Sequence, residues 1–200
     1  MKVRQFYSIR VDLNSLLALI VLSGLLLCVF PQFAASQFIL SRESWNAKPP
    51  ITQRMKRHRI KEIVIHHIGF PKDGNKSIGQ KLRKLQTHAQ RNKPWGDIPY
   101  HFYIDMHGVI AEGRDLKYAG DTNTGYNPAN RIHIVLEGDF NREEPGAKQR
   151  LALQSLVGKM RSKYSLPASK VFGHGDRAPT ACPGEHLHRL VEVLSRGGTI

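Results

Sequence analysis

Cysteine is scarce in this sequence, with two in 200 residues, which excludes a framework of several disulfide bonds. Acidic residues are also few: 16 Asp and Glu face 30 Lys and Arg, giving a formal net charge of +14. Repeats and low-complexity tracts are absent, and 17 Gly and 11 Pro are ordinary numbers, so collagen-like, coiled-coil and fully disordered classes are excluded. The length favours one globular domain. The basic charge predicts an anionic partner such as nucleic acid, lipid head groups or a cell-wall polymer.

Long apolar runs are absent except near the N-terminus, where three basic residues precede an uninterrupted apolar or small stretch at 15–30. This pattern is typical of an export segment. The stretch is shorter than the roughly 20 residues that cross a bilayer comfortably, so a cleaved signal peptide and a signal anchor attached to the membrane both stay open. Ala34 and Ser36 favour cleavage after residue 36. We therefore expect an export segment at 1–36 and a single domain at 37–200.

Export predicts a location in the periplasm or cell envelope, either secreted or held at the membrane. It argues against a nucleic-acid partner and favours an envelope polymer. Residues 1–36 carry three basic groups and one acidic group, so +12 of the +14 charge remains on the exported part. Cys182 is then the only cysteine of the domain. A single thiol in an oxidising compartment is a metal ligand, a nucleophile or an inert buried side chain.

Apolar strands alternate with amphipathic helices along the domain, which predicts an α/β fold with a mixed central sheet flanked by helices. Strands are expected at 61–66, 100–105, 109–112, 132–136 and 170–172. Helices are expected after the capping residue Ser77 and before Pro94, at 148–163, and through the apolar positions 187, 190, 191 and 194. The Pro-rich and basic stretch 41–61 has no period and is expected to be an extended arm.

Two expected strands end in histidine, at Ile-Val-Ile-His-His (63–67) and Val-Phe-Gly-His (171–174), and Cys182 follows eight residues after the second. One histidine of the first pair, His174 and Cys182 would form a catalytic zinc site with its fourth position open. His66 and His67 point to opposite faces of a strand, so only one of them can be a metal ligand. The alternatives are unliganded histidines with an inert cysteine, or a metal-free hydrolase in which His174 activates Cys182. The place of Cys182 before the last helix predicts a lowered thiol pKa.

Four blocks of sequence carry a family resemblance. They are Ser-Arg-Glu-Ser-Trp-Asn-Ala-Lys-Pro-Pro at 41–50, the strand 63–67, Trp-Gly-Asp-Ile-Pro-Tyr-His-Phe at 95–102 with Glu-Gly-Arg at 112–114, and the loop 173–184. In this order they resemble the zinc-dependent N-acetylmuramoyl-L-alanine amidases of the amidase-2 type. That family includes phage lysozyme-like amidases and peptidoglycan recognition proteins. The resemblance spans nearly all of residues 39–190 and implies the same single-domain fold.

The resemblance implies site residues. It selects His66 rather than His67 and gives one Zn2+ per chain, held by His66, His174 and Cys182. It gives Tyr100 a catalytic role beside the metal, and Thr180 matches the threonine of the active recognition proteins. Trp95 and His67 are expected to line the substrate groove.

The implied function is hydrolysis of the amide between N-acetylmuramic acid and the L-alanine of peptidoglycan stem peptides, with peptidoglycan or a muropeptide as partner. The alternative is a non-catalytic module that recognises peptidoglycan. Two departures from the family stand out. Gly120-Asp121-Thr122 replaces a loop histidine of the recognition proteins. Val135 stands where cytosolic relatives place a glutamate base, although Glu137 is expected on the same face.

Overall fold

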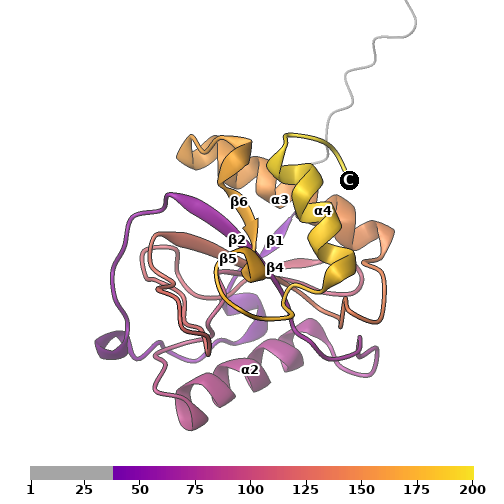
Figure 1. Ribbon diagram of the computed structural model, residues 1–200. Coiled ribbons are helices and arrows are strands. Elements are labelled where there is room, and N and C mark those ends of the chain that lie inside the picture. The colour runs from indigo at the N-terminus through magenta and orange to yellow at the C-terminus, as the bar shows by residue number, and fades with distance from the viewer. Residues whose placement is uncertain (1–37) are drawn as a thin grey trace, which may run out of the picture. The chain divides into compact units, whose positions relative to one another are not determined.

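The computed structural model describes residues 38–200, and its six strands form one mixed sheet (Figure 1). The predicted export segment and its boundary lie outside the described residues. The strands are β1 (Ile39–Leu40), β2 (Glu62–His67), β3 (Phe102–Ile104), β4 (Ile110–Glu112), β5 (Arg131–Leu136) and β6 (Val171–Gly173), in the order β1-β4-β3-β5-β2-β6. The hairpin β3-β4 is antiparallel, and the other neighbouring pairs are parallel. This confirms the predicted α/β class.

One face of the sheet is covered by α3 (Ala147–Tyr164) and α4 (Glu185–Ser195), as Figure 1 shows. The apolar stripe of α3 includes Leu153, Leu156 and Met160, and all three pack in the main core with the alternate residues Ile63 and Ile65 of β2. A fully buried aliphatic side chain contributes about 1.5–3 kcal/mol relative to an exposed one. The predicted helical stripes therefore supply the main core.

The opposite face is covered by α2 (Ile78–Asn92) and the short 3-10 helix Glu43–Trp45. Ser77 caps α2, because its hydroxyl accepts from Gln80 N–H while the Gln80 side chain accepts from Ser77 N–H. Trp45 is 1% exposed and packs with Leu82 in a second apolar cluster. Its indole N–H donates to Glu112 O at 2.8 Å, which ties the N-terminal arm to β4.

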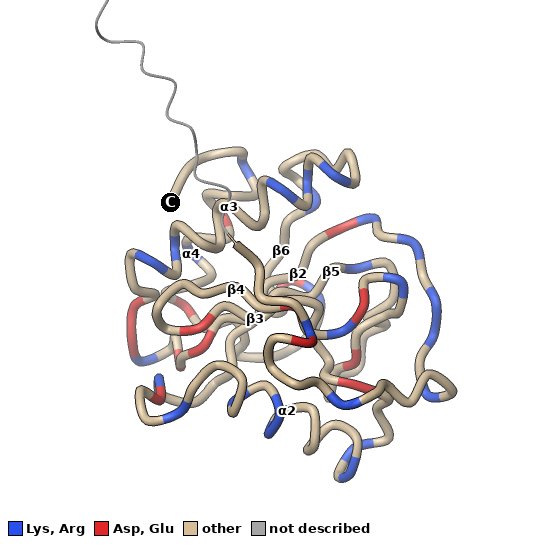
Figure 2. The backbone as a smooth tube through the Cα atoms, turned by 180° about the vertical axis from the view of Figure 1, so that it is seen from behind, with Lys and Arg blue, Asp and Glu red and all other residues tan. Residues whose placement is uncertain are grey.

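The arm is less extended than the sequence predicts. Two 3-10 helices, Glu43–Trp45 and Thr52–Arg54, interrupt it, and β1 precedes it. Figure 2 shows lysine and arginine on α2, α3 and α4 as well as on the loops, so the basic charge is spread around the domain. No helix in the described part of the chain combines the length and apolarity needed to span a membrane.

Candidate metal centre

Three side chains predicted as ligands converge at the carboxyl ends of two neighbouring strands. His66 lies near the end of β2, His174 directly follows β6, and Cys182 precedes α4. One ligand atom of each residue lies within 4.8 Å of the others. Cys182 Sγ is 3.7 Å from His66 Nδ1, close to the separation of about 3.6 Å expected between sulfur and nitrogen ligands of tetrahedral zinc. The donor set and its spacing therefore fit a zinc ion.

Strand pairing explains how ligands distant in sequence meet. β2 and β6 are parallel neighbours with Ile65 paired to Gly173, so the residues that follow, His66 and His174, lie side by side. Their ring centroids are 4.6 Å apart. Because successive strand residues alternate between faces, His67 points away from His66. The structure thus brings His66 to the cluster, as the family resemblance implies.

Cys182 is held by backbone hydrogen bonds. Its N–H donates to Thr180 Oγ1 at 3.2 Å, and its Sγ accepts from His67 N–H at 3.4 Å. Burial raises the pKa of the thiol to about 12, against a lowering effect of that N–H group. The predicted lowering of the pKa by the last helix is therefore wrong, because desolvation outweighs it. A metal-free nucleophile loses support, whereas a bound divalent cation would deprotonate the thiol directly.

Both candidate histidine ligands are buried and neutral at neutral pH. Burial is the largest cause that lowers the pKa of His66 well below its ordinary value, and it also lowers the pKa of His174. Neutral imidazole is the form that binds metals. Each ring also has a partner on Nε2: His133 Nδ1 is 2.9 Å from His66, and Thr124 Oγ1 is 2.8 Å from His174. Such partners orient metal-binding histidines.

Tyr100 lies beside the cluster, with its ring centroid 5.3 Å from that of His66. Its backbone is fixed by the two residues that follow β4, Gly113 and Arg114. Arg114 N–H donates to Tyr100 O at 2.8 Å, and a side chain on Gly113 would place Cβ 2.3 Å from the same oxygen. Burial raises the pKa of the Tyr100 hydroxyl, so the group is a neutral hydrogen-bond donor at neutral pH. This explains why Glu-Gly-Arg accompanies the tyrosine block.

Buried polar groups fix the loop that carries Tyr100. The guanidinium of Arg114, a residue 2% exposed, donates to Asp97 O at 2.9 Å. The Asp97 carboxylate pairs with Arg42 at 2.9 Å and accepts from Gln86 Nε2 at 2.7 Å. The N-terminal arm, α2 and the loop are thus joined at one carboxylate.

The remaining predicted residues differ in their distance from the cluster. The Thr180 hydroxyl lies near Cys182, and both residues line a pocket of about 280 Å³. His67 lies on the other side of β2, where its Nδ1 accepts from Phe140 N–H at 3.2 Å. Trp95 is half-buried with the Lys93 ammonium 5.9 Å from its ring centroid. In residues 38–200, no hydrogen bond or ring contact joins Trp95 to the cluster.

Sequence reasoning missed three residues at the cluster: His133, Thr124 and Tyr126. The Tyr126 ring lies 5.2 Å from that of His174, and its hydroxyl is buried without a hydrogen-bond partner. Strand alternation could have placed His133 on one face of β5. The local sequence pattern does not say which strand lies next to β5, so the contact between His133 and β2 could not be predicted.

Glu137 does not serve the cluster. Its carboxylate pairs with Lys81 of α2 at 2.7 Å and accepts from the backbone N–H groups of Asp73 and Met106 at 2.9 and 3.1 Å. These contacts fasten α2 and the β3-β4 turn to the end of β5. Val135, at the position of the cytosolic glutamate, packs in the apolar cluster under α2.

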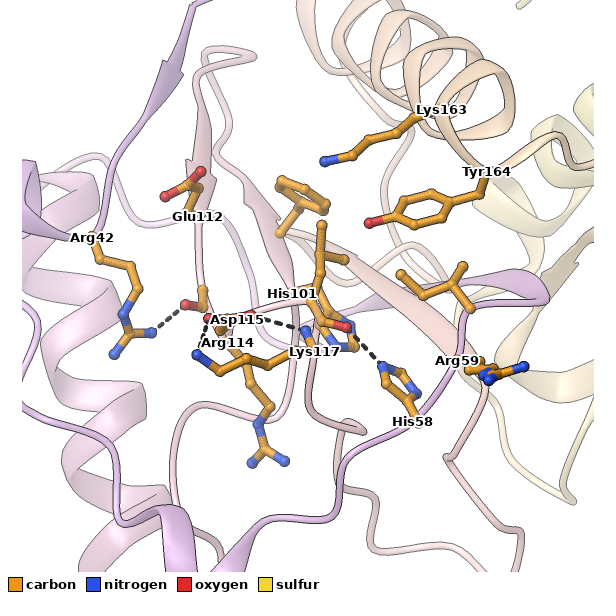
Figure 3. A pocket seen from close by; sticks show the side chains of 14 residues that line it. Arg42, His58, Arg59, His101, Glu112, Arg114, Asp115, Lys117, Lys163 and Tyr164 are labelled. Atoms are coloured by element: carbon orange, nitrogen blue, oxygen red, sulfur yellow. Dashed lines mark hydrogen bonds and ion pairs between the residues drawn. The ribbon is translucent and has the colours of Figure 1, made fainter.

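A pocket of about 700 Å³ lies elsewhere, with none of the three candidate ligands in its wall (Figure 3). Lys163 and Arg59 border it from α3 and the arm, and His58 and His101 form part of its floor. The His101 ring stacks on His133 at 5.6 Å and on His58 at 5.8 Å. A row of imidazoles, His66, His133, His101 and His58, therefore runs from the cluster of candidate ligands to this pocket.

A mixed sheet between helices, with two histidines and a cysteine at the ends of parallel strands and a buried tyrosine beside them, defines a class of α/β domains with a His/His/Cys cluster that could hold a metal ion. The sequence model of the amidase-2 family, described as N-acetylmuramoyl-L-alanine amidase, matches residues 56–185. The chain belongs to this family.

Its relatives include peptidoglycan recognition proteins. The chain is 31% identical to peptidoglycan-recognition protein LB of Drosophila melanogaster over 156 residues, 76% of this chain and 67% of the relative. It is 29% identical to mouse peptidoglycan recognition protein 1 over 175 residues, 84% and 93% of the two chains. A solved structure of a Drosophila PGRP-LB mutant in complex with tracheal cytotoxin superposes with a TM-score of 0.69 at 27% identity, covering 81% and 96%.

Proposed function

We propose that this protein is a zinc-dependent N-acetylmuramoyl-L-alanine amidase that hydrolyses the amide between N-acetylmuramic acid and the first L-alanine of peptidoglycan stem peptides. The observation that carries the proposal is the convergence of His66, His174 and Cys182 within 4.8 Å, with the neutral Tyr100 beside them. The family match supports the reaction type.

His66, His174 and Cys182 would hold one zinc ion per chain, and two neutral imidazoles with one thiolate leave a site charge near +1. When bound, zinc supplies Lewis-acid polarisation of the scissile carbonyl and lowers the pKa of a coordinated water. The Tyr100 hydroxyl donates to the oxygen on which negative charge develops. The Thr180 hydroxyl accepts from Cys182 N–H, so its own proton is available as a further donor.

On the substrate side, the basic surface would attract the carboxylates of the stem peptide. The PGRP-LB complex with tracheal cytotoxin supports a peptidoglycan fragment or polymer as partner. Trp95 and His67 are proposed to line the substrate groove. The tests are Trp95→Ala and His67→Ala, each of which should raise KM with little change in zinc content, and an unchanged KM would remove that residue from the groove.

The decisive experiment measures zinc content together with release of stem peptides from purified peptidoglycan, before and after chelation and zinc re-addition. We expect about one zinc per chain, and activity that chelation abolishes and zinc restores. Cys182→Ala removes one ligand and should lose both zinc and activity. The matched control is Ser169→Ala, because Ser169 lies outside the cluster and should leave both unchanged. Release that survives chelation would contradict the proposed ligand set.

Recognition without cleavage is the second candidate function, because the relatives are named recognition proteins. It predicts normal zinc content and binding to insoluble peptidoglycan with no release of stem peptides. A Tyr100→Phe variant separates the two functions. Binding to peptidoglycan should persist whichever function is correct, whereas the substitution lowers a rate of stem-peptide release only if the protein is an amidase.

We also propose that the protein acts outside the cytoplasm after export through residues 1–36. N-terminal sequencing of the protein from the envelope and the medium tests this. A start at Gln37 indicates cleavage, an intact N-terminus in the membrane fraction indicates a signal anchor, and a wholly cytoplasmic protein contradicts export.

A further inference from the structure

His66, one of the three candidate metal ligands, forms a direct pair with a second buried histidine, His133. His66 Nε2 and His133 Nδ1 are 2.9 Å apart, and the residues are 3% and 0% exposed. One of the two nitrogens must carry the proton between them, and the other must accept it. Which nitrogen carries it decides whether His66 can offer its other nitrogen, Nδ1, to a metal.

The far side of His133 settles the direction of this bond. His133 Nε2 lies 3.1 Å from Pro128 O, and a carbonyl oxygen only accepts, so the proton of the neutral ring is on Nε2. Nδ1 of His133 then has a free lone pair and must accept from His66 Nε2–H. His66 consequently has no proton on Nδ1, the atom that lies 3.7 Å from Cys182 Sγ.

The His133 ring is also prevented from turning. A side chain on Gly120 would place Cβ 2.6 Å from His133 Cδ2, so the loop passes directly against the ring. On another side the ring of His101 stacks at 5.6 Å, and the backbone N–H of His133 donates to His101 Nδ1 at 2.9 Å. Rotating the imidazole would break the Pro128 contact and expose the wrong nitrogen to His66.

We propose that His133 is a positioning residue that selects the Nε2–H tautomer of His66 and thereby presents Nδ1 of His66 to the metal. The inference rests on the proposed metal centre and deepens it. Because the hydrogen bonds from His66 end at Pro128 O, His133 acts on the orientation and tautomer of one ligand rather than as a proton relay.

The test compares two substitutions of nearly equal size, His133→Leu and His133→Asn. Both remove the ring and its contact with Pro128, but the Asn carboxamide oxygen can still accept from His66 Nε2–H, whereas leucine cannot. Long-range proton–nitrogen NMR spectra of the zinc-free full chain report the tautomer of His66. We expect Nε2–H in the wild type and in His133→Asn, and a mixture of tautomers in His133→Leu.

Zinc affinity, measured by competition with a chromophoric chelator, is the second readout. His133→Leu should bind zinc about 10- to 100-fold more weakly, while His133→Asn should stay close to the wild type. Thermal melting of the zinc-free variants shows whether both are folded. Equal affinities of two folded variants, or a wild-type His66 with its proton on Nδ1, would overturn the inference.

These outcomes separate the inference from the proposed function. The tautomer is read without metal or substrate, so a protein that binds zinc but releases no stem peptide would end the amidase proposal and leave the role of His133 standing. Conversely, an active amidase whose His133→Leu variant keeps its tautomer and affinity would end the inference alone.

Discussion

The ion pair between Arg42 and Asp97 allows a quantitative test of how the N-terminal arm supports the site. The Asp97 side chain is 1% exposed and that of Arg42 is 18% exposed, and their nearest atoms are 2.9 Å apart. Replacing Arg42 with methionine keeps the apolar stem but leaves a buried carboxylate with hydrogen bonds from Gln86 and its neighbour Ile98 only. The carboxylate would then lack a countercharge.

Breaking a buried pair from one side destabilises a protein by about 3–5 kcal/mol. We expect about 4 kcal/mol for Arg42→Met, since its hydrogen bond to Gly113 O is lost as well. Asp97→Asn should destabilise by about 2 kcal/mol, because the partly exposed Arg42 can turn toward water. The double variant has no unpaired charge, so its destabilisation should be smaller than the sum of the two single-variant destabilisations by about 2 kcal/mol or more.

The assay is urea unfolding of the wild type, both single variants and the double variant at neutral pH, followed by circular dichroism. A coupling energy of at least about 2 kcal/mol supports the account. If the losses in unfolding free energy of the two single variants add up to the loss of the double variant within about 0.5 kcal/mol, the account is refuted, since Arg42 and Asp97 would then contribute to stability independently.

Three further predictions follow from the site. Tyr100→Phe should lower kcat about 100- to 1000-fold with unchanged zinc content, and a loss of zinc instead would assign the ring a structural role. Zinc-free protein should lose stability as pH falls below about 6.5, because His66, His101 and His133 have lowered pKa values in the folded state and the unfolded chain therefore binds more protons. In urea unfolding, the free energy of unfolding should fall by up to about 1.4 kcal/mol per pH unit for each histidine. A free energy of unfolding that does not change between pH 7 and 5 would contradict this. Gly120→Ala should destabilise by about 1–3 kcal/mol in thermal or urea melts, since its Cβ would lie 2.6 Å from the His133 ring, and wild-type stability would show that the loop yields freely.

The elements with a strong local pattern could be predicted from the sequence. Ile63-Val64-Ile65 indicates a strand covered on both faces, and the structure places β2 between β5 and β6 with all three residues fully buried. The helical stripes of α3 and α4 have the same basis, because a period of 3.6 residues is a local property of the chain. The carboxyl ends of the predicted strands then indicated where the candidate metal ligands would lie.

Elements that depend on distant partners could not be predicted. β1 has two residues and exists because Ile39 and Leu40 pair with β4, a contact that no local period encodes. The same holds for His133. Its contact with His66 depends on β5 lying next to β2, which only the sheet order reveals. Burial likewise reversed the expected direction of the Cys182 pKa, since a sequence position near a helix says nothing about desolvation.

The distance along the chain between His66 and Cys182, 116 residues, has a consequence for how the protein matures. Until β6 pairs with β2 and the following loop closes, a growing chain has His66 at the site, with neither His174 nor the Cys182 thiol beside it. The three candidate ligands therefore come together only when the C-terminal part of the domain folds, so a metal ion that needs all three would be bound after that step. A chain that ends before Cys182 would lack the sulfur ligand of the candidate site, although all six strands of the sheet precede that residue.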